Sequence, residues 1–105
     1  MSQHRVGIGL APVLPQDVSV LARMLFASAL AEREALCRTV FDGARQGQAH
    51  LHRTGRLHPL WGNGSLEAAS RALAGRGPTI APEPLWDNAD YLSCLELVLQ
   101  HLRRQ

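Results

Sequence analysis

The strongest constraint on the fold comes from the C-terminal segment, residues 87–104, where apolar side chains recur at helical spacing over a broad face. These side chains are Tyr91, Leu92, Leu95, Val98, Leu99 and Leu102. A helix with so wide an apolar face has to bury most of it. A chain of 105 residues offers one modest core,. The segment therefore predicts either a central helix covered by its neighbours or a helix that also pairs with another copy. We expect Asp87 to cap it, with Asp90 completing a capping-box-like pair.

Three earlier segments also have helical periodicity. The first helix is expected to start at Pro15 or Gln16, because Pro suits a first turn and Asp17 suits the positive helix end. Ser28 is a plausible N-cap for a second helix over residues 29–52. Gly43 and Gly47 in that segment indicate either close approach of another helix or an earlier end near Ala44.

Thr54 and Gly55 are expected to end the second helix, and residues 56–64 to form an irregular turn because of their proline and glycines. A short third helix follows, capped within residues 63–65, with Leu66, Ala69 and Leu73 on its buried face. Residues 74–86 hold three prolines and two glycines, and they predict a long irregular connector. Ile80, Leu85 and Trp86 are expected to anchor that connector to the core.

These patterns predict an all-α fold, a small bundle of three to four helices in a single domain over residues 1–105. The composition agrees, since aromatic residues make up 5% of the chain and β-branched residues are scarce, which favours helix over strand. Residues 1–14 are expected to form a flexible N-terminal arm. No segment is long and apolar enough for a membrane span, and Asp17 and Arg23 interrupt the apolar run at 18–31. We therefore expect a cytoplasmic protein.

Basic side chains gather in a segment without acidic residues, between Asp42 and Glu67. All eleven cationic residues of the chain are arginines, whose guanidinium groups bind phosphate in two-point fashion. The segment predicts a nucleic-acid contact, with Trp61 available to stack on a base. The alternative is that the arginines are solvated and Trp61 packs on the core beside Pro59. The candidate nucleic-acid-binding residues are Arg45, Arg53, Arg56 and His58.

The sequence does not indicate catalysis or metal binding. His50 and His52 point apart on a helix, and no cysteine or carboxylate nearby completes a tetrahedral metal site. No nucleophile elbow, phosphate-binding loop or paired-carboxylate motif is present. We expect a protein that is not an enzyme and uses no cofactor or metal. Cys37 and Cys94 are expected to be two buried thiols, with a disulfide between them left open.

Three motifs resemble short uncharacterised proteins of alphaproteobacteria that are encoded near the head and DNA-packaging genes of gene transfer agents, which are phage-like particles. The motifs are RTGRLHPLWGNGSLEAA at residues 53–69, LPxD at 14–17 and DxADYLxCLxLVL at 87–99. The resemblance implies a small terminase subunit, a helical, oligomeric, non-enzymatic protein that brings DNA to the packaging ATPase of the large terminase. The chain lacks a clear helix-turn-helix and a long coiled coil, so we expect weak, non-specific DNA contact.

Two functions from different classes remain open at this point. The first is a DNA-packaging accessory of small-terminase type that contacts DNA and forms homo-oligomers. The second is a helical protein–protein adaptor that touches no nucleic acid. In both, the partner-binding face is expected on the last helix, at Tyr91, Leu95, Val98 and Leu102.

Overall fold

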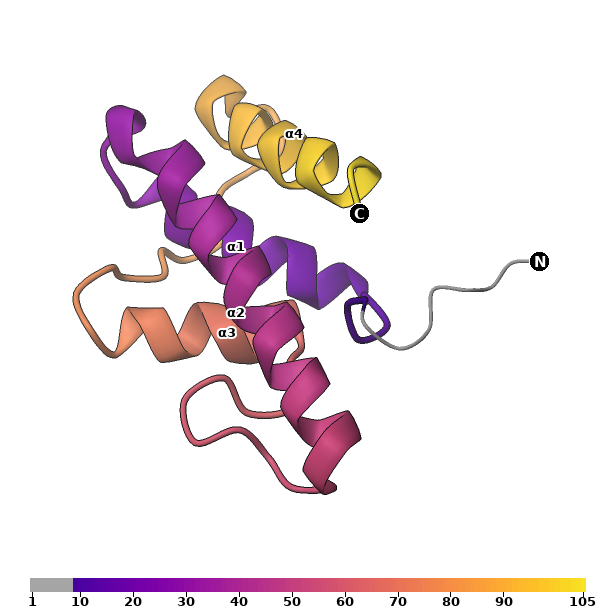
Figure 1. Ribbon diagram of the computed structural model, residues 1–105. Helices are drawn as coiled ribbons and strands as arrows, with labels where there is room; N and C mark the ends of the chain where they lie inside the picture. Colours follow the sequence, from indigo (N-terminus) through magenta and orange to yellow (C-terminus); the bar gives the residue numbers. More distant parts are fainter. Residues whose placement is uncertain (1–8) are drawn as a thin grey trace.

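The computed structural model describes residues 9–105, and these residues form an all-α bundle without a strand (Figure 1). The elements are α1 (Pro15–Phe26), the 3₁₀ helix η1 (Leu30–Glu32), α2 (Arg33–Thr54), α3 (Leu66–Ala74) and α4 (Ala89–Arg103). The predicted fold class is confirmed, and the long connector before the last helix occupies residues 75–88. None of the described helices is long and apolar enough to cross a membrane.

Helix α1 is the centre of the bundle. It packs against α2, α3 and α4, while α3 and α4 lie on opposite sides of it (Figure 1). The molecule measures 40 × 33 × 21 Å, and its shortest dimension matches two helix diameters of about 10–12 Å each. The bundle is therefore two helices thick, with its core between them.

The core combines aliphatic side chains with a few aromatic rings. Its fully buried members include Leu21, Met24, Leu25, Val40, Phe41, Ala69, Tyr91 and Val98. Phe26 of α1 meets Tyr91 of α4 edge to face, with ring centroids 5.9 Å apart. This geometry is the favourable one for an aromatic pair.

Helix α1 starts at Pro15, as predicted, and Asp17 does more than favour its first turn. The Asp17 carboxylate, 3% exposed, accepts a hydrogen bond from the backbone N–H of Leu14 at 2.8 Å. It also accepts one from the N–H of Glu67 in the first turn of α3, at 2.9 Å. One buried carboxylate thus satisfies N-terminal donors of two helices, which ties α1 to α3.

The predicted arm is only partly within the described residues. Residues 1–8 lie outside them, so that part of the prediction stays a prediction. Leu10 packs against the core, and Leu14 is bonded to Asp17. Residues 10–14 therefore belong to the folded domain, because an apolar side chain and a cap hold them to α1.

Ser28 does not cap α2, which corrects the prediction. Its hydroxyl donates to the carbonyl of Met24 at 2.8 Å. The chain makes the 3₁₀ turn η1 before α2 begins at Arg33, not at Ala29. The Arg33 guanidinium donates to the carbonyl oxygens of Phe26, the last residue of α1, and of Ser28, which follows it.

Helix α2 continues past its glycines to Thr54 and ends at Gly55, whose φ of 71° is left-handed. The predicted end at Gly55 is confirmed, and the alternative end near Ala44 is excluded. Gly43 and Gly47 do mark a close approach, but to the turn after α2 rather than to another helix. A Cβ on Gly43 would lie 2.6 Å from the Trp61 ring.

Two predictions about α4 and its approach were wrong. Asn88, rather than Asp87, is the N-cap, since its side-chain oxygen accepts from the N–H of Tyr91 at 3.0 Å. Leu85 and Trp86 do not anchor the connector, because they are 76% and 65% exposed. Ile80 does pack against the core.

Candidate nucleic-acid interface

The turn after α2 is a closed loop held at both ends. His58 and Gly62 exchange two backbone hydrogen bonds of 3.0 Å each, and Gly62 has a φ of 62° that favours glycine,. Trp61, 8% exposed, packs on Gly43 of α2. The turn is therefore fixed on α2, and Trp61 has almost no surface for stacking on a base, which supports the packing alternative.

His58 is oriented by the turn itself. Its Nδ1 accepts hydrogen bonds from the backbone N–H groups of Leu60 and Trp61, at 3.0 and 3.1 Å. Because two donors occupy Nδ1, the neutral ring carries its proton on Nε2. The His58 ring lies 5.1 Å from that of His50 in a T-shaped arrangement.

Arg53 joins this pair from the last turn of α2. Its guanidinium lies 3.3 Å from Nδ1 of His50, and since a guanidinium only donates, His50 accepts. Arg53, from the last turn of α2, and His58, from the turn that follows, thus both lie next to the His50 ring. We call Arg53, Arg56, His50 and His58 the basic corner.

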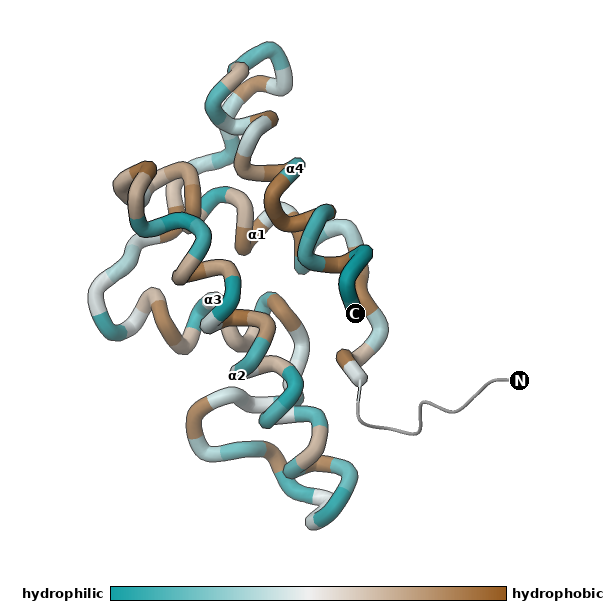
Figure 2. The backbone as a smooth tube through the Cα atoms, turned by 45° about the horizontal axis from the view of Figure 1, so that its top comes forward, coloured by the Kyte–Doolittle hydropathy of each residue, from teal (hydrophilic) through white to brown (hydrophobic). Residues whose placement is uncertain are grey.

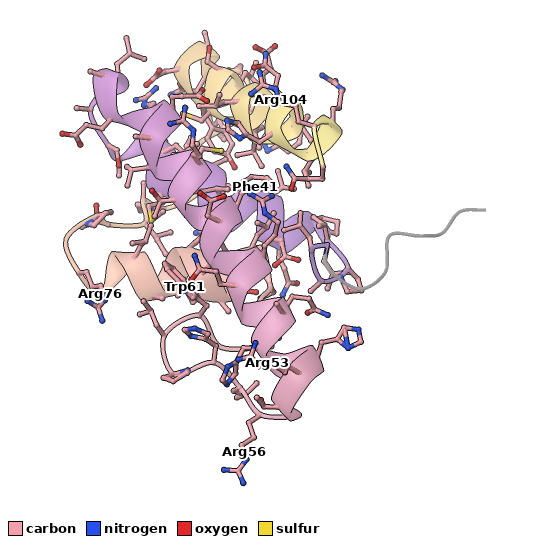
Figure 3. The ribbon with its side chains drawn as sticks, in the orientation of Figure 1. Phe41, Arg53, Arg56, Trp61, Arg76 and Arg104 are labelled. Atoms are coloured by element: carbon pink, nitrogen blue, oxygen red, sulfur yellow. The ribbon has the colours of Figure 1, made fainter. Side chains whose placement is uncertain are left out.

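Arg56 completes the basic corner at its outer edge. Figure 3 shows its side chain pointing away from the body of the molecule, at the end opposite Arg104. Within the described residues, neither Arg53 nor Arg56 pairs with a carboxylate, whereas Arg33, Arg38, Arg45 and Arg71 do. Figure 2 shows hydrophilic colours alternating with apolar ones towards the end of α2. The corner therefore presents charge that the described residues do not neutralise.

Arg45 does not belong to the basic corner. Its guanidinium pairs with Asp42 on the same helix and contacts the side chain of Gln105 after α4. Arg45 and Arg53 are eight residues apart in one helix, which places them about 12 Å apart along the axis and about 80° around it. Of the four predicted residues, the structure brings together Arg53, Arg56 and His58, and the sequence-based list omitted His50.

The predicted partner face of α4 is divided by burial. Tyr91 and Val98 are fully buried in the core, while Leu95 and Leu102 are half-buried and pack against it. Leu92 and Leu99, in contrast, are 37% and 41% exposed. Partner binding by α4 stays a prediction. The surface of α4 that is available to a partner is the side that bears Leu92 and Leu99.

A groove of about 450 Å³ runs beside this side of α4. Its lining comes from α1, from the end of the connector and from α4: Pro15, Val18, Ser19, Trp86, Tyr91, Leu92, Leu95, Glu96 and Leu99. Glu96 is the one charged residue of that lining among residues 9–105. Grooves lined mainly by apolar side chains are a common form of binding surface, so this groove is a candidate for one.

The cysteines, Cys37 and Cys94, and the histidines of residues 9–105 form no metal cluster. No group of three or more His, Cys, Asp or Glu side chains in the described part of the chain lies close enough to hold a metal ion. Cys37 and Cys94 are buried free thiols, as expected. Burial raises the pKa of Cys37 to about 12 and also raises that of Cys94. Neither thiol is thus an activated nucleophile.

Comparison with known proteins gives one family. Residues 11–102 match a family described as "Domain of unknown function (DUF7742)". No curated protein matches the chain, and neither does a solved structure.

Proposed function

Since the chain belongs to the DUF7742 family, whose description assigns no activity, we propose its function from its surface: a non-catalytic accessory protein of DNA packaging that contacts the phosphate backbone through the basic corner. The observation that carries the proposal is that Arg53, beside the His50–His58 pair, and the nearby Arg56 have no carboxylate partner among the described residues. Phosphate contacts of this kind are independent of base sequence.

The packaging context comes from the resemblance of residues 53–69 and 87–99 to proteins encoded beside gene transfer agent packaging genes. In that context the large terminase, a packaging ATPase, is the protein partner. The contact with DNA is weak, since two arginines neutralise few phosphates and the net charge is only +2,. The protein would bring DNA and the ATPase together without chemistry of its own.

The test is DNA binding by fluorescence anisotropy as a function of salt. Each neutralised phosphate contributes about −0.9 to the slope of log K against log salt. The Arg53→Ala/Arg56→Ala variant is expected to reduce that slope by about 2 and to weaken binding at low salt. The Arg38→Ala/Arg76→Ala variant changes the net charge equally but leaves the corner intact, so it is expected to bind like the wild type. Equal binding by both variants would contradict the site.

The second candidate is a protein–protein adaptor without nucleic-acid contact. The observation that favours it is the apolar groove between α1 and α4. It predicts no salt-dependent DNA retention in the wild type and a stable complex with a different protein through that groove. Co-purification from the native cells, followed by anisotropy with the purified chain, separates the two candidates.

A further inference from the structure

Helix α4 carries two rows of side chains with the same spacing: an inner row that is buried in the core, and an outer row that packs against the core only at Leu95 and Leu102. The inner row, Tyr91, Cys94, Val98 and His101, is buried. The outer row is displaced by one residue and consists of Leu92, Leu95, Leu99 and Leu102. Its 3-4-3 spacing is that of a coiled-coil seam. Leu92 and Leu99 in this row are 37% and 41% exposed.

The outer row borders the groove with α1, and Trp86 extends the same apolar surface. Trp86 lines the groove and is 65% exposed, and Leu92 and Leu99 of the same lining are also exposed. Single exposed leucines are ordinary, but several around one groove favour an interface. The alternating apolar and polar stretches of α4 are visible in Figure 2.

The spacing of the outer row favours a second copy of the same chain. Read in either direction the row is 3-4-3, so in an antiparallel pair Leu92 faces Leu102 and Leu95 faces Leu99 without a register shift. A two-fold interface requires a surface that is self-complementary in this sense. The twofold axis then passes near Leu97.

The charges at the two ends of α4 are complementary in the same orientation. Asp87 lies just before its start, and Arg103 and Arg104 lie at its end. The other acidic residue of that start, Asp90, is already paired with Arg33 of the same chain. An antiparallel pair brings the arginines of one copy to the acidic end of the other, and the opposed helix dipoles favour the same orientation. A parallel pair would place like charges together at both ends.

We propose that two copies of this chain associate through the outer leucine row of α4, antiparallel about a two-fold axis near Leu97, each α4 lying in the groove of its partner. The interface is small, so the dimer is in exchange with monomer at a dissociation constant on the order of 10 µM. In this dimer the Glu96 side chains of the two copies lie beside each other near the axis, where their carboxylates repel. This proposal is independent of the basic corner and of DNA binding.

The first test is sedimentation equilibrium of the full chain between about 1 µM and 1 mM, a range that spans the expected dissociation constant. The mass is expected to rise from 11.5 kDa towards twice that value. Leu92→Glu/Leu99→Glu is expected to weaken association by at least about 100-fold, since it places charges in the seam. Leu57→Glu alters a 64% exposed leucine in the α2–α3 turn and is expected to leave association unchanged. Circular dichroism checks that each variant is folded.

The second test determines orientation by disulfide cross-linking. Glu96→Cys is expected to cross-link to its own copy, because residue 96 lies next to the axis. Arg103→Cys is not expected to cross-link. Residue 103 lies six residues from the axis in each copy, so the two thiols would be about 18 Å apart along the helices. The native Cys37 and Cys94 are buried and do not compete. Glu96→Gln is expected to tighten association several-fold.

Three results would overturn the proposal. One is a chain that stays monomeric at about 1 mM, two orders of magnitude above the expected constant. Another is cross-linking of Arg103→Cys as fast as that of Glu96→Cys, which would indicate a parallel pair. The third is equal loss of association in Leu57→Glu and in the double leucine variant. A monomer that binds a different protein through the groove would assign the surface to that protein.

Discussion

At the residue scale, the glycines of α2 are explained by the turn that packs on them. A Cβ on Gly47 would lie 2.8 Å from the Cα of Gly64 and 3.0 Å from its nitrogen. Both neighbours are backbone atoms, so relief requires the whole turn to move. The cost to helix propensity of a glycine, about 1 kcal/mol, is offset by contacts that a larger residue would prevent.

Gly47→Ala is therefore expected to destabilise the protein despite the better helix propensity of alanine. Overpacking against backbone costs about 1–3 kcal/mol. Gly75→Ala is the control, because a Cβ there meets its nearest neighbour at 3.6 Å and the residue has an ordinary φ of −72°. Urea unfolding is expected to show a lower midpoint for Gly47→Ala and an unchanged or higher one for Gly75→Ala. A Gly47→Ala variant of wild-type stability would contradict the close contact.

Adjacent residues before α4 offer a second comparison at this scale. Asn88 accepts from the N–H of Tyr91, whereas the structure assigns no cap bond to Asp87. Asn88→Ala is expected to cost about 1 kcal/mol, and Asp87→Ala less than about 0.5 kcal/mol. Chemical unfolding of the two variants side by side measures the difference. The reverse order would restore the sequence-based assignment of the cap.

At the element scale, one ion pair fastens the start of α4 to the start of α2. Arg33 donates to both carboxylate oxygens of Asp90, at 2.7 and 3.1 Å. Arg33 is 8% exposed, while the Asp90 side chain is 53% exposed. Hydrogen bonds from Arg33 lower the pKa of Asp90 below its ordinary 3.8. This two-point pair replaces the capping box expected for Asp90.

Asp90→Asn is expected to destabilise the protein by about 1–2 kcal/mol at neutral pH, since Arg33 stays buried and loses its charged partner. The depressed pKa means that the contribution is complete above pH 3.8 and is lost as pH falls through the folded-state pKa. The stability difference between the wild type and Asp90→Asn should therefore shrink from about pH 7 to about pH 2.5. Unfolding curves at both pH values measure it.

The matched control for that prediction is Arg38→Gln. Arg38 pairs with Glu34 at 3.5 Å on the surface of α2, with both side chains about half exposed. Its removal is expected to change stability by less than about 0.5 kcal/mol. A stability difference between the wild type and Asp90→Asn that stays constant down to low pH would show that the carboxylate charge contributes nothing to stability.

At the scale of the whole molecule, the two cysteines report on the integrity of the core. Cys37 in α2 and Cys94 in α4 are both buried, and burial raises the pKa of each. They lie in different helices, so exposing both requires the helices to separate. Their reactivity therefore measures opening of the bundle rather than a local motion.

In the native protein, neither cysteine is expected to react with Ellman's reagent until the bundle opens, and both are expected to react in denaturant. Ser93→Cys provides the control, because residue 93 is exposed on α4 and its thiol should react at once. The labelling rate of the wild type should rise with urea along the unfolding curve. Rapid reaction of one native thiol without denaturant would contradict the packed core.

The basic corner was partly predictable because its members are close in sequence. Arg53, Arg56 and His58 stay together wherever α2 ends, since a turn of a few residues cannot separate them. The separation of Arg45 from them was not predicted, because it depends on α2 continuing through Gly43 and Gly47. The contact of Trp61 with Gly43 shows why a glycine stands inside the helix at that position.

The sequence by itself determined the helical elements, the end of α2 at Gly55 and the irregular connector, because propensity, periodicity and turn chemistry act over a few residues. Only the tertiary structure decided which flank of α4 is covered, which of two adjacent polar residues caps it, and where Trp61 and Trp86 lie. Each of these depends on which surfaces meet across the bundle. Tyr91 is buried while its neighbour Leu92 is exposed, because α4 is apolar on both sides and α1 packs against only one of them.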